Sequence, residues 1–189
     1  MEPASVVAMV IQALNDCNIP FMIVGSLSSN AYGIERSTKD ADFVIQLGNF
    51  PLSTLFQKLP EGFSLDHQIG FETITSTTRY RIRYTPLNFL IELFELGEDA
   101  HDQARFQSRV PTTYNGVPAF LPRPEDVIIT KLRWAVSGKS RAKDIDDVRN
   151  VLDVQRGELD MDYVSQWCQQ HGTLELLEQT LQSIPPLPE

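Results

Sequence analysis

The chain of 189 residues has few cysteines and no long apolar run. Its two cysteines, Cys17 and Cys168, lie far apart in sequence, which favours reduced thiols over a disulfide framework. The longest apolar runs fall far short of the roughly 20 residues that span a bilayer. No basic residue precedes the apolar stretch near the N-terminus, so a signal peptide is not predicted either. We therefore expect a cytoplasmic protein without a membrane partner.

Basic residues are also scarce, with 16 against 25 acidic residues and a formal net charge of −9. This balance argues against a broad non-specific grip on nucleic acid, because counterion release needs a basic surface. A local basic strip remains, since Arg79, Arg81 and Arg83 alternate and would share one face of a strand. Two interpretations stay open: a face that is solvated or paired with carboxylates, or a guide for an acceptor RNA.

Hydrophobic periodicity predicts an α/β first part of the chain. Helical spacing covers 4–17, 27–32 and 51–59, and strands are predicted at 21–25 and 40–47. Strand patterns then dominate up to residue 120, in the segments FSLD, ETITS, TRYRIRY, NFLIELFEL, RVPTTY and VPAF. Asn115-Gly116 predicts a hairpin turn between the last two segments. The polar segment 97–107 is expected to be a loop or one helical turn, in which His101-Asp102 is either part of a solvated loop or reaches the cleft.

From Pro124 the apolar period becomes helical. Pro124 followed by Glu125 and Asp126 is typical of a helix start, because proline fits the first turn and acids favour the positive end of the helix dipole. The predicted helices cover 124–137, 141–154, 160–171 and 173–183. The fold class is therefore α+β, with a mixed sheet in residues 1–120 and a helical region in 121–189. No flexible linker separates the two parts, so we expect them to pack together and share a cleft.

Two carboxylates on one strand are the strongest chemical signal. Asp40 and Asp42 lie two residues apart, so they point to the same face. Like charges this close repel, and Mg²⁺ is the usual cation between such oxygens, with Mn²⁺ as the alternative. Glu92 interrupts an apolar strand, where an unpaired acid is costly, and is our candidate for a third ligand; Glu95 is the second choice. The competing interpretation is that the two aspartates merely solvate an edge strand.

Gly25-Ser26 lies between the predicted strand at 21–25 and the helix at 27–32. Backbone N–H groups at such a turn can bind phosphate, and glycine permits close approach. A Gly-Ser turn is also common in purely structural roles, so both interpretations stay open.

Together these features resemble the nucleotidyltransferase superfamily that includes DNA polymerase beta-like enzymes. The family motif combines a Gly-Ser turn, an Asp-x-Asp strand and a third acid on a later strand, matched here by Gly25-Ser26, Asp40-Ala41-Asp42 and Glu92. The segments RSTKDADFVI and PEDVIITKLRWA…RAKDIDDVRNVL are similar to the AbiEii-type toxin or DUF6036-like minimal branch. The resemblance covers residues 20–155.

The resemblance implies a nucleotidyltransferase core with a helical bundle beside it, and Mg²⁺-dependent transfer of a nucleoside monophosphate from an NTP to an acceptor hydroxyl. The acceptor it implies is tRNA, a protein or a small molecule such as an aminoglycoside-like drug. A toxin role, with an antitoxin as partner, is an expectation at the level of the branch.

Carried over residue by residue, the resemblance assigns roles to most of the candidate site. Asp40, Asp42 and Glu92 would be the catalytic metal ligands, and Gly25, Ser26, Thr38, Lys131 and Asp144 would bind the nucleotide. Lys131 would neutralise phosphate charge, and Asp144 would orient the nucleotide or Lys131. Arg36 is a further nucleotide-binding candidate, with a surface charge or a partner of Asp40 as alternatives. Asp146 and Asp147 are interpreted as a charged helix face.

One residue departs from the family pattern. The third acid is usually aspartate, and the longer Glu92 occupies that place here. This departure motivates a second hypothesis, a nucleotide-binding or interaction module with a weakened active site.

Overall fold

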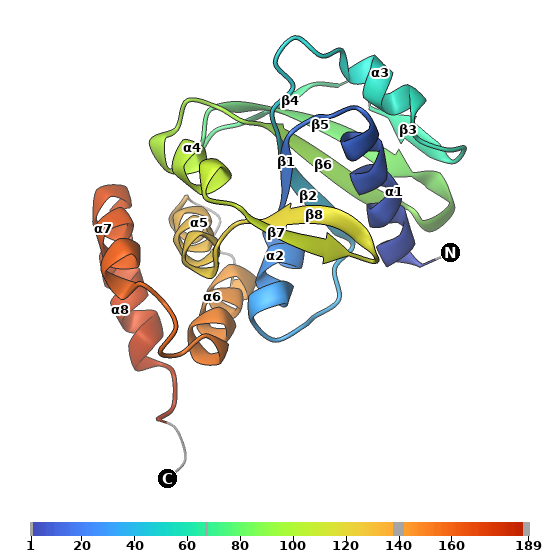
Figure 1. Cartoon of the computed structure of the whole chain (residues 1–189). Coiled ribbons are helices and arrows are strands. Elements are labelled where there is room, and N and C mark those ends of the chain that lie inside the picture. Colours follow the sequence, from blue (N-terminus) through green and yellow to red (C-terminus); the bar gives the residue numbers. More distant parts are fainter. Residues whose placement is uncertain (1, 67, 138–141, 187–189) are drawn as a thin grey trace. The chain divides into compact units, whose positions relative to one another are not determined.

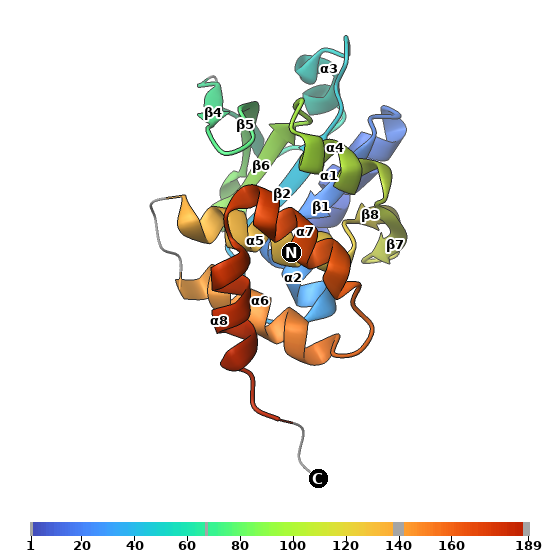
Figure 2. The same cartoon turned by 90° about the vertical axis from the view of Figure 1, so that its left-hand side faces the viewer.

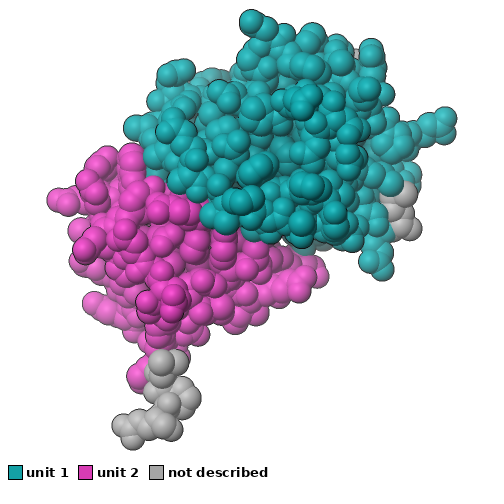
Figure 3. Space-filling view, viewed as in Figure 1, with its two compact units in different colours: residues 1–24, 38–122 teal, residues 25–37, 123–189 magenta. Residues whose placement is uncertain are grey.

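The structure is a computed structural model that describes residues 2–66, 68–137 and 142–186. It divides into two compact units, each discontinuous in sequence (Figure 3). Unit 1 comprises residues 1–24 and 38–122, and unit 2 comprises residues 25–37 and 123–189. The sequence-based division at residue 120 places residues 25–37 in the α/β part, whereas the structure groups them with the C-terminal helices.

Unit 1 is built on a mixed β-sheet (Figure 1). Its elements, in chain order, are α1 (Pro3–Asp16), β1 (Phe21–Val24), β2 (Asp40–Ile45), α3 (Leu52–Gln57), β3 (Phe63–Leu65), β4 (Gly70–Glu72), β5 (Thr77–Tyr84), the 3-10 turn η1 (Thr85–Leu87), β6 (Phe89–Glu95), α4 (Ala100–Gln107), β7 (Val110–Tyr114) and β8 (Val117–Leu121). The strand order is β1-β2-β6-β5-β3, with β4 also paired to β5. Among the described residues, β2 and β6 are the one pair of strands that runs in parallel, and β7 and β8 form a separate hairpin. The predicted α+β class is confirmed.

One face of the sheet forms the core of unit 1, because side chains alternate between the two faces of a strand. Phe43, Leu93 and Ile82 lie on this face and are fully buried. Phe21 packs edge-on against Phe43 and Phe120, with ring centroids 6.3 and 6.0 Å apart. The opposite face carries Asp40 and Asp42 of β2, Glu92 of β6 and the arginines of β5, which are described below.

Two segments of unit 1 differ from the prediction. ETITS is not a strand: only Glu72 belongs to β4, and its carboxylate accepts hydrogen bonds from the backbone N–H groups of Ile74 and Thr75 at 2.7 and 2.8 Å, which holds a turn. The segment 97–107 is also more ordered than expected, because it contains α4.

Helix α4 is held by its own polar residues. Asp99 caps it by accepting a hydrogen bond from the Asp102 N–H at 2.9 Å. Asp102 and Arg105 form a buried ion pair at 2.7 Å, and His101 is buried rather than solvated. The expectation of a solvated loop here was therefore wrong, since these residues form a helix in which Asp102 and Arg105 are buried as a pair.

Unit 2 is a set of helices (Figure 2) with an apolar core of its own. Its elements are α2 (Gly25–Tyr32), α5 (Pro124–Val136), α6 (Ala142–Val154), α7 (Met161–His171) and α8 (Leu174–Gln182). Helix α5 contacts α2, α6 and α7, while α8 contacts α6 and α7. The core is formed by apolar side chains of the four C-terminal helices, including Ile128, Leu132, Val148, Val151, Val164, Cys168 and Leu177. The predicted helices are confirmed, although residue 141 and the tail at 187–189 lie outside the described residues.

Both cysteines are free, as the sequence predicts. Among the described residues, no helix has both the length and the hydropathy required to cross a bilayer.

Candidate functional site

The acidic residues of unit 1 lie on the polar face of the sheet. Asp40 and Asp42 share this face because they are two residues apart in β2. The parallel register of β2 and β6 pairs Asp42 with Glu92 and Asp40 with Leu90. Directly paired residues point to the same side of a sheet, so Glu92 lies on the polar face, next to Asp42. Glu95 lies on the opposite face, where it accepts a hydrogen bond from the Tyr80 hydroxyl at 3.3 Å.

The Asp40 side chain is held by Thr38, which lies two residues before it, just ahead of strand β2. The Thr38 hydroxyl donates a hydrogen bond to Asp40 Oδ1 at 2.7 Å. Thr38 was expected to touch phosphate; in the structure its hydroxyl orients the Asp40 carboxylate. Both side chains are half-buried.

Glu92 contacts arginines of β5. The β5–β6 register places Arg81 directly opposite Glu92, and Arg81 Nε lies 3.0 Å from Glu92 Oε1. Arg79 Nη1 lies 3.3 Å from the same oxygen. Arg83 instead donates to the side-chain oxygen of Asn88 at 2.7 Å. Of the two interpretations of this arginine face, carboxylate pairing is the one seen for Arg79 and Arg81.

The donor chemistry of the polar face fits a divalent cation. Asp40 and Asp42 supply carboxylate oxygens on one face, and hard oxygen ligands are what Mg²⁺ prefers. The residues that the structure describes contain no group of three or more His, Cys, Asp or Glu side chains gathered to hold a metal. On this face the Glu92 carboxylate contacts the arginines of β5.

The Gly25-Ser26 turn begins helix α2 in unit 2. Gly25 has φ +64°, a left-handed conformation that glycine adopts without a steric penalty. The Ser28 hydroxyl donates to the Gly25 carbonyl at 2.9 Å, and the Ser29 hydroxyl donates to the Ser26 carbonyl at 3.0 Å. The first turn of α2 therefore stabilises itself, and its N–H groups point out of the helix start, as they do in phosphate-binding turns.

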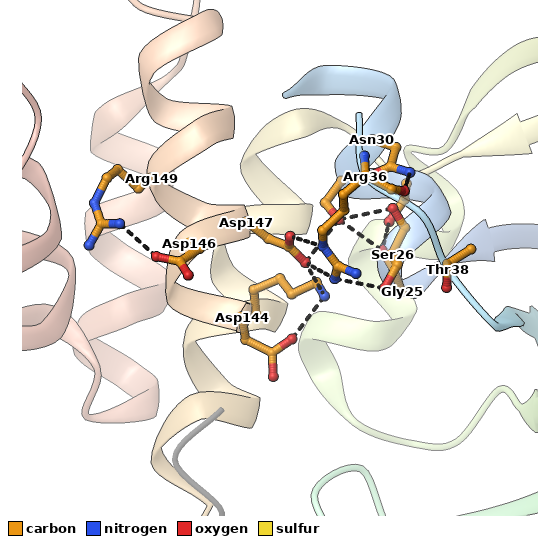
Figure 4. Close-up of polar contacts among 12 residues, drawn as sticks. Gly25, Ser26, Asn30, Arg36, Thr38, Asp144, Asp146, Asp147 and Arg149 are labelled. Carbon is orange, nitrogen blue, oxygen red and sulfur yellow. Dashed lines mark hydrogen bonds and ion pairs between the residues drawn. The ribbon is translucent and has the colours of Figure 1, made fainter. Parts of the chain in front are cut away.

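A buried charge network joins the remaining predicted residues of unit 2 (Figure 4). Asp147 contacts Arg36 through Nε at 2.7 Å and Nη2 at 2.8 Å, and it contacts Lys131 Nζ at 2.8 Å. Lys131 Nζ also lies 2.9 Å from Asp144 Oδ1. Arg36 Nη2 donates to Ser26 Oγ at 2.9 Å, which links the network to the turn.

Among the described residues, these contacts join two cations, Arg36 and Lys131, to two carboxylates, Asp144 and Asp147. Burial by itself would raise the pKa of Asp147, but hydrogen bonds from Arg36 and Lys131, together with their charges, outweigh it and lower that pKa. Asp147 therefore remains a carboxylate at neutral pH. Asp144 was expected to orient the nucleotide or Lys131, and in the structure it contacts Lys131.

Asp147 contacts two of the predicted site residues, Arg36 and Lys131, and sequence reasoning missed it because it was assigned to a charged helix face. Its side chain is 3% exposed, whereas that of Asp146 is 61% exposed. The missed signal is the helical stripe: Asp144 and Asp147 precede Val148 and Val151 at the spacing i, i+3, i+4, i+7, which defines the buried face of α6.

The predicted site residues fall into two sets. Thr38, Asp40, Asp42 and Glu92 belong to unit 1, and Gly25, Ser26, Arg36, Lys131 and Asp144 belong to unit 2. Within each unit the members of a set lie close to one another through the register or the contacts given above.

Comparison with solved structures shows that the chain has the fold of nucleotidyltransferases. It aligns with the antibiotic-resistance factor ANT(2'')-Ia over 93% of this chain and 96% of that chain, with 13% identity and a TM-score of 0.62. It aligns with an antigenic nucleotidyltransferase-like protein from Paracoccidioides brasiliensis over 97% and 94%, with 18% identity and a TM-score of 0.57. The lincosamide antibiotic adenylyltransferase LnuA aligns over 79% and 96%, with 12% identity and a TM-score of 0.52. No family model and no curated protein matches the sequence.

Proposed function

We propose that this protein transfers a nucleoside monophosphate from an NTP to an acceptor hydroxyl and releases pyrophosphate. The observation that carries the proposal is the placement of Asp40 and Asp42 on one sheet face, with Glu92 in register beside Asp42. This acidic face occurs in a fold shared with enzymes such as LnuA, described as a lincosamide antibiotic adenylyltransferase with bound lincomycin, and ANT(2'')-Ia, which is also known in complex with adenylyl-2''-tobramycin.

The residues of unit 1 would bind the cation. Asp40 and Asp42 hold it, and Thr38 keeps the Asp40 carboxylate in one orientation. A divalent cation bound there would neutralise phosphate charge and lower the pKa of the attacking hydroxyl.

The residues of unit 2 would bind the triphosphate. The N–H groups at Gly25 and Ser26 donate to phosphate oxygens, as helix starts do in other phosphate sites. Lys131 has three N–H donors, of which Asp144 and Asp147 accept two, so the third donates to a phosphate oxygen. Its two carboxylate partners fix the position of the ammonium group and offset its charge.

The acceptor that we would test first is a small hydroxyl compound, because ANT(2'')-Ia and LnuA are both described with antibiotics. Transfer to tRNA or to a protein, and a toxin role with an antitoxin partner, remain predictions from the sequence resemblance. They belong in the same assay as parallel acceptors.

A second candidate function is an NTP-binding module without turnover. The contact of Glu92 with Arg79 and Arg81 favours it, because a third acid engaged elsewhere leaves the cation with two carboxylates.

Label transfer separates the two functions. The protein is incubated with each α-labelled NTP, with Mg²⁺ or Mn²⁺, and with an aminoglycoside, a lincosamide, bulk tRNA or protein as acceptor. We expect transfer that is lost in Asp40→Asn and Asp42→Asn and retained in Asp146→Asn, which removes an exposed acid. Glu92→Gln should reduce transfer more than Glu95→Gln, which changes the opposite face of the same strand.

Thermal unfolding with and without ligands completes the test. A ligand that binds only the folded state raises the unfolding temperature. Stabilisation by NTP without transfer to any acceptor would favour the binding module. If neither NTP nor the cation stabilises the wild type, both functions are ruled out.

A further inference from the structure

Glu92 lies between two sets of groups of opposite charge. In the sheet its Cα is paired with Asp42 of β2 on one side and with Arg81 of β5 on the other. All three side chains point to the polar face, because paired residues of neighbouring strands share a face. The Glu92 carboxylate can therefore extend toward the aspartates or toward the arginines.

The structure shows the carboxylate with the arginines. Arg81 Nε and Arg79 Nη1 both approach Glu92 Oε1, at 3.0 and 3.3 Å. The Glu92 side chain is 16% exposed, and those of Arg79 and Arg81 are 24% and 37% exposed. The three side chains thus form a partly exposed cluster at the edge of the acidic face, and we name it the Glu92 clamp.

Electrostatics explain this choice and predict when it reverses. Without a cation, Asp40 and Asp42 repel a third carboxylate, while two guanidinium groups attract it. A divalent cation between the aspartates reverses the sign of the field on that side. Partly exposed ion pairs each shift an equilibrium by only roughly 1.5- to 5-fold, so a bound cation can compete with them.

We propose that Arg79 and Arg81 compete with the divalent cation for Glu92, so that full ligation of the cation requires the clamp to open. The inference rests on the proposed function, since it assumes a cation at Asp40 and Asp42. Arg79 and Arg81 act through Glu92 and are positioning residues. Their effect is to weaken cation binding and to make Glu92 a ligand that is recruited rather than preformed.

The test is the affinity for Mn²⁺ alone, measured from the electron paramagnetic resonance signal of free Mn²⁺ during titration. Arg81→Gln should tighten Mn²⁺ binding by roughly 1.5- to 5-fold, and the double change Arg79→Gln/Arg81→Gln by about 10-fold, because the pairs that hold Glu92 are removed. A matched control is Arg83→Gln, which removes the same charge from the same strand face but contacts Asn88 rather than a carboxylate. It should change the affinity by less than the Arg81 variant does.

A double-mutant cycle separates clamp release from a general charge effect. When Glu92 is already replaced by glutamine, Arg81→Gln should not tighten Mn²⁺ binding any further. If Arg81→Gln tightens Mn²⁺ binding equally in the Glu92→Gln background, or if Arg83→Gln tightens it as much as Arg81→Gln does, the clamp is overturned, since the loss of positive charge alone would explain the tighter binding. Weaker Mn²⁺ binding by Arg81→Gln would also overturn it, because Arg81 would then orient Glu92 for the cation.

Failure of the proposed function gives a different pattern. If the wild type binds no Mn²⁺, or if Asp40→Asn and Asp42→Asn bind it as well as the wild type, the cation site itself is wrong and the clamp is rejected with it. Circular dichroism melting of each variant checks that it folds. If Arg81→Gln does not fold, the single Arg79→Gln variant carries the comparison.

Discussion

Replacing Asp147 with asparagine should destabilise unit 2 strongly. The Asp147 side chain is 3% exposed and accepts hydrogen bonds from Arg36 and Lys131 at 2.7–2.8 Å. Removing one partner of a buried ion pair costs about 3–5 kcal/mol, because the remaining charges lose their compensation. We expect the lower end, about 3 kcal/mol, because the asparagine carbonyl still accepts one hydrogen bond.

The assay can be confined to unit 2. Both tryptophans, Trp134 in α5 and Trp167 in α7, lie in this unit, so their fluorescence follows its unfolding. A loss of about 3 kcal/mol corresponds to a fall in unfolding temperature of roughly 6–12 °C for a chain of this size. The matched control is Asp146→Asn one residue away, whose partner Arg149 is also exposed; its effect should stay within about 0.5 kcal/mol.

The pH dependence supplies an independent check. The pKa of Asp147 is lowered in the folded protein from an ordinary value of 3.8, so the unfolded state takes up its proton first as the pH falls. Its stabilisation is fully present above pH values near 3.8 and is lost as the pH drops toward the folded pKa. The gap between wild type and Asp147→Asn should therefore be constant at neutral pH and shrink in acid. Equal unfolding temperatures for the Asp147 and Asp146 variants would refute this account of the network.

Three further outcomes follow from single residues. Gly25→Ala should destabilise unit 2 by about 1–2 kcal/mol because φ is +64°, and unchanged tryptophan unfolding would contradict that geometry. Tyr163→Phe should lower the free energy of unfolding by about 1–3 kcal/mol, since the Tyr163 hydroxyl donates to fully buried Asp126 at 2.8 Å. Burial and Asp126 raise the pKa of Tyr163 to about 12, and ultraviolet titration of the variant should no longer show this tyrosine. Phe43→Ala should destabilise unit 1 by about 3–5 kcal/mol, measured by far-ultraviolet circular dichroism, because Phe43 is fully buried. Phe71→Ala is the control: this side chain is exposed, so the free energy of unfolding should change by less than about 0.5 kcal/mol.

The acidic face was predictable because it depends on local alternation. Asp40 and Asp42 share a face in any strand, and the opposite parity of Glu92 and Glu95 assigns them to different faces once β6 is recognised. What alternation cannot give is the register. The pairing of Glu92 with Arg81 joins two strands whose relative shift is set by packing, so the competition between arginines and aspartates appears only in the fold.

The sequence interpretation was wrong where charged side chains are buried together with a partner of opposite charge. Asp147, together with Asp102 and Arg105 in α4, would cost free energy if buried alone, which is why sequence reasoning placed these residues in solvent. Each has a buried partner of opposite charge: Arg105 for Asp102 in the same helix, and Lys131 from another helix for Asp147. Spacing was the better guide, since Asp144 and Asp147 continue the apolar stripe of α6.

The path of the chain between the units has a consequence for synthesis on the ribosome. Residues 25–37 emerge early, but their packing partners in unit 2, α5 and α6, are encoded after residue 122. At ordinary elongation rates the interval is on the order of ten seconds. During that time Tyr32 lacks the core residues of unit 2 against which it packs, and Gly33, where a Cβ would lie 3.2 Å from Asn150 Cβ and Val151 N, lacks its neighbours in α6. A nascent chain stalled before α6 should therefore expose α2 to proteolysis or to chaperones, and completion of α6 should protect it.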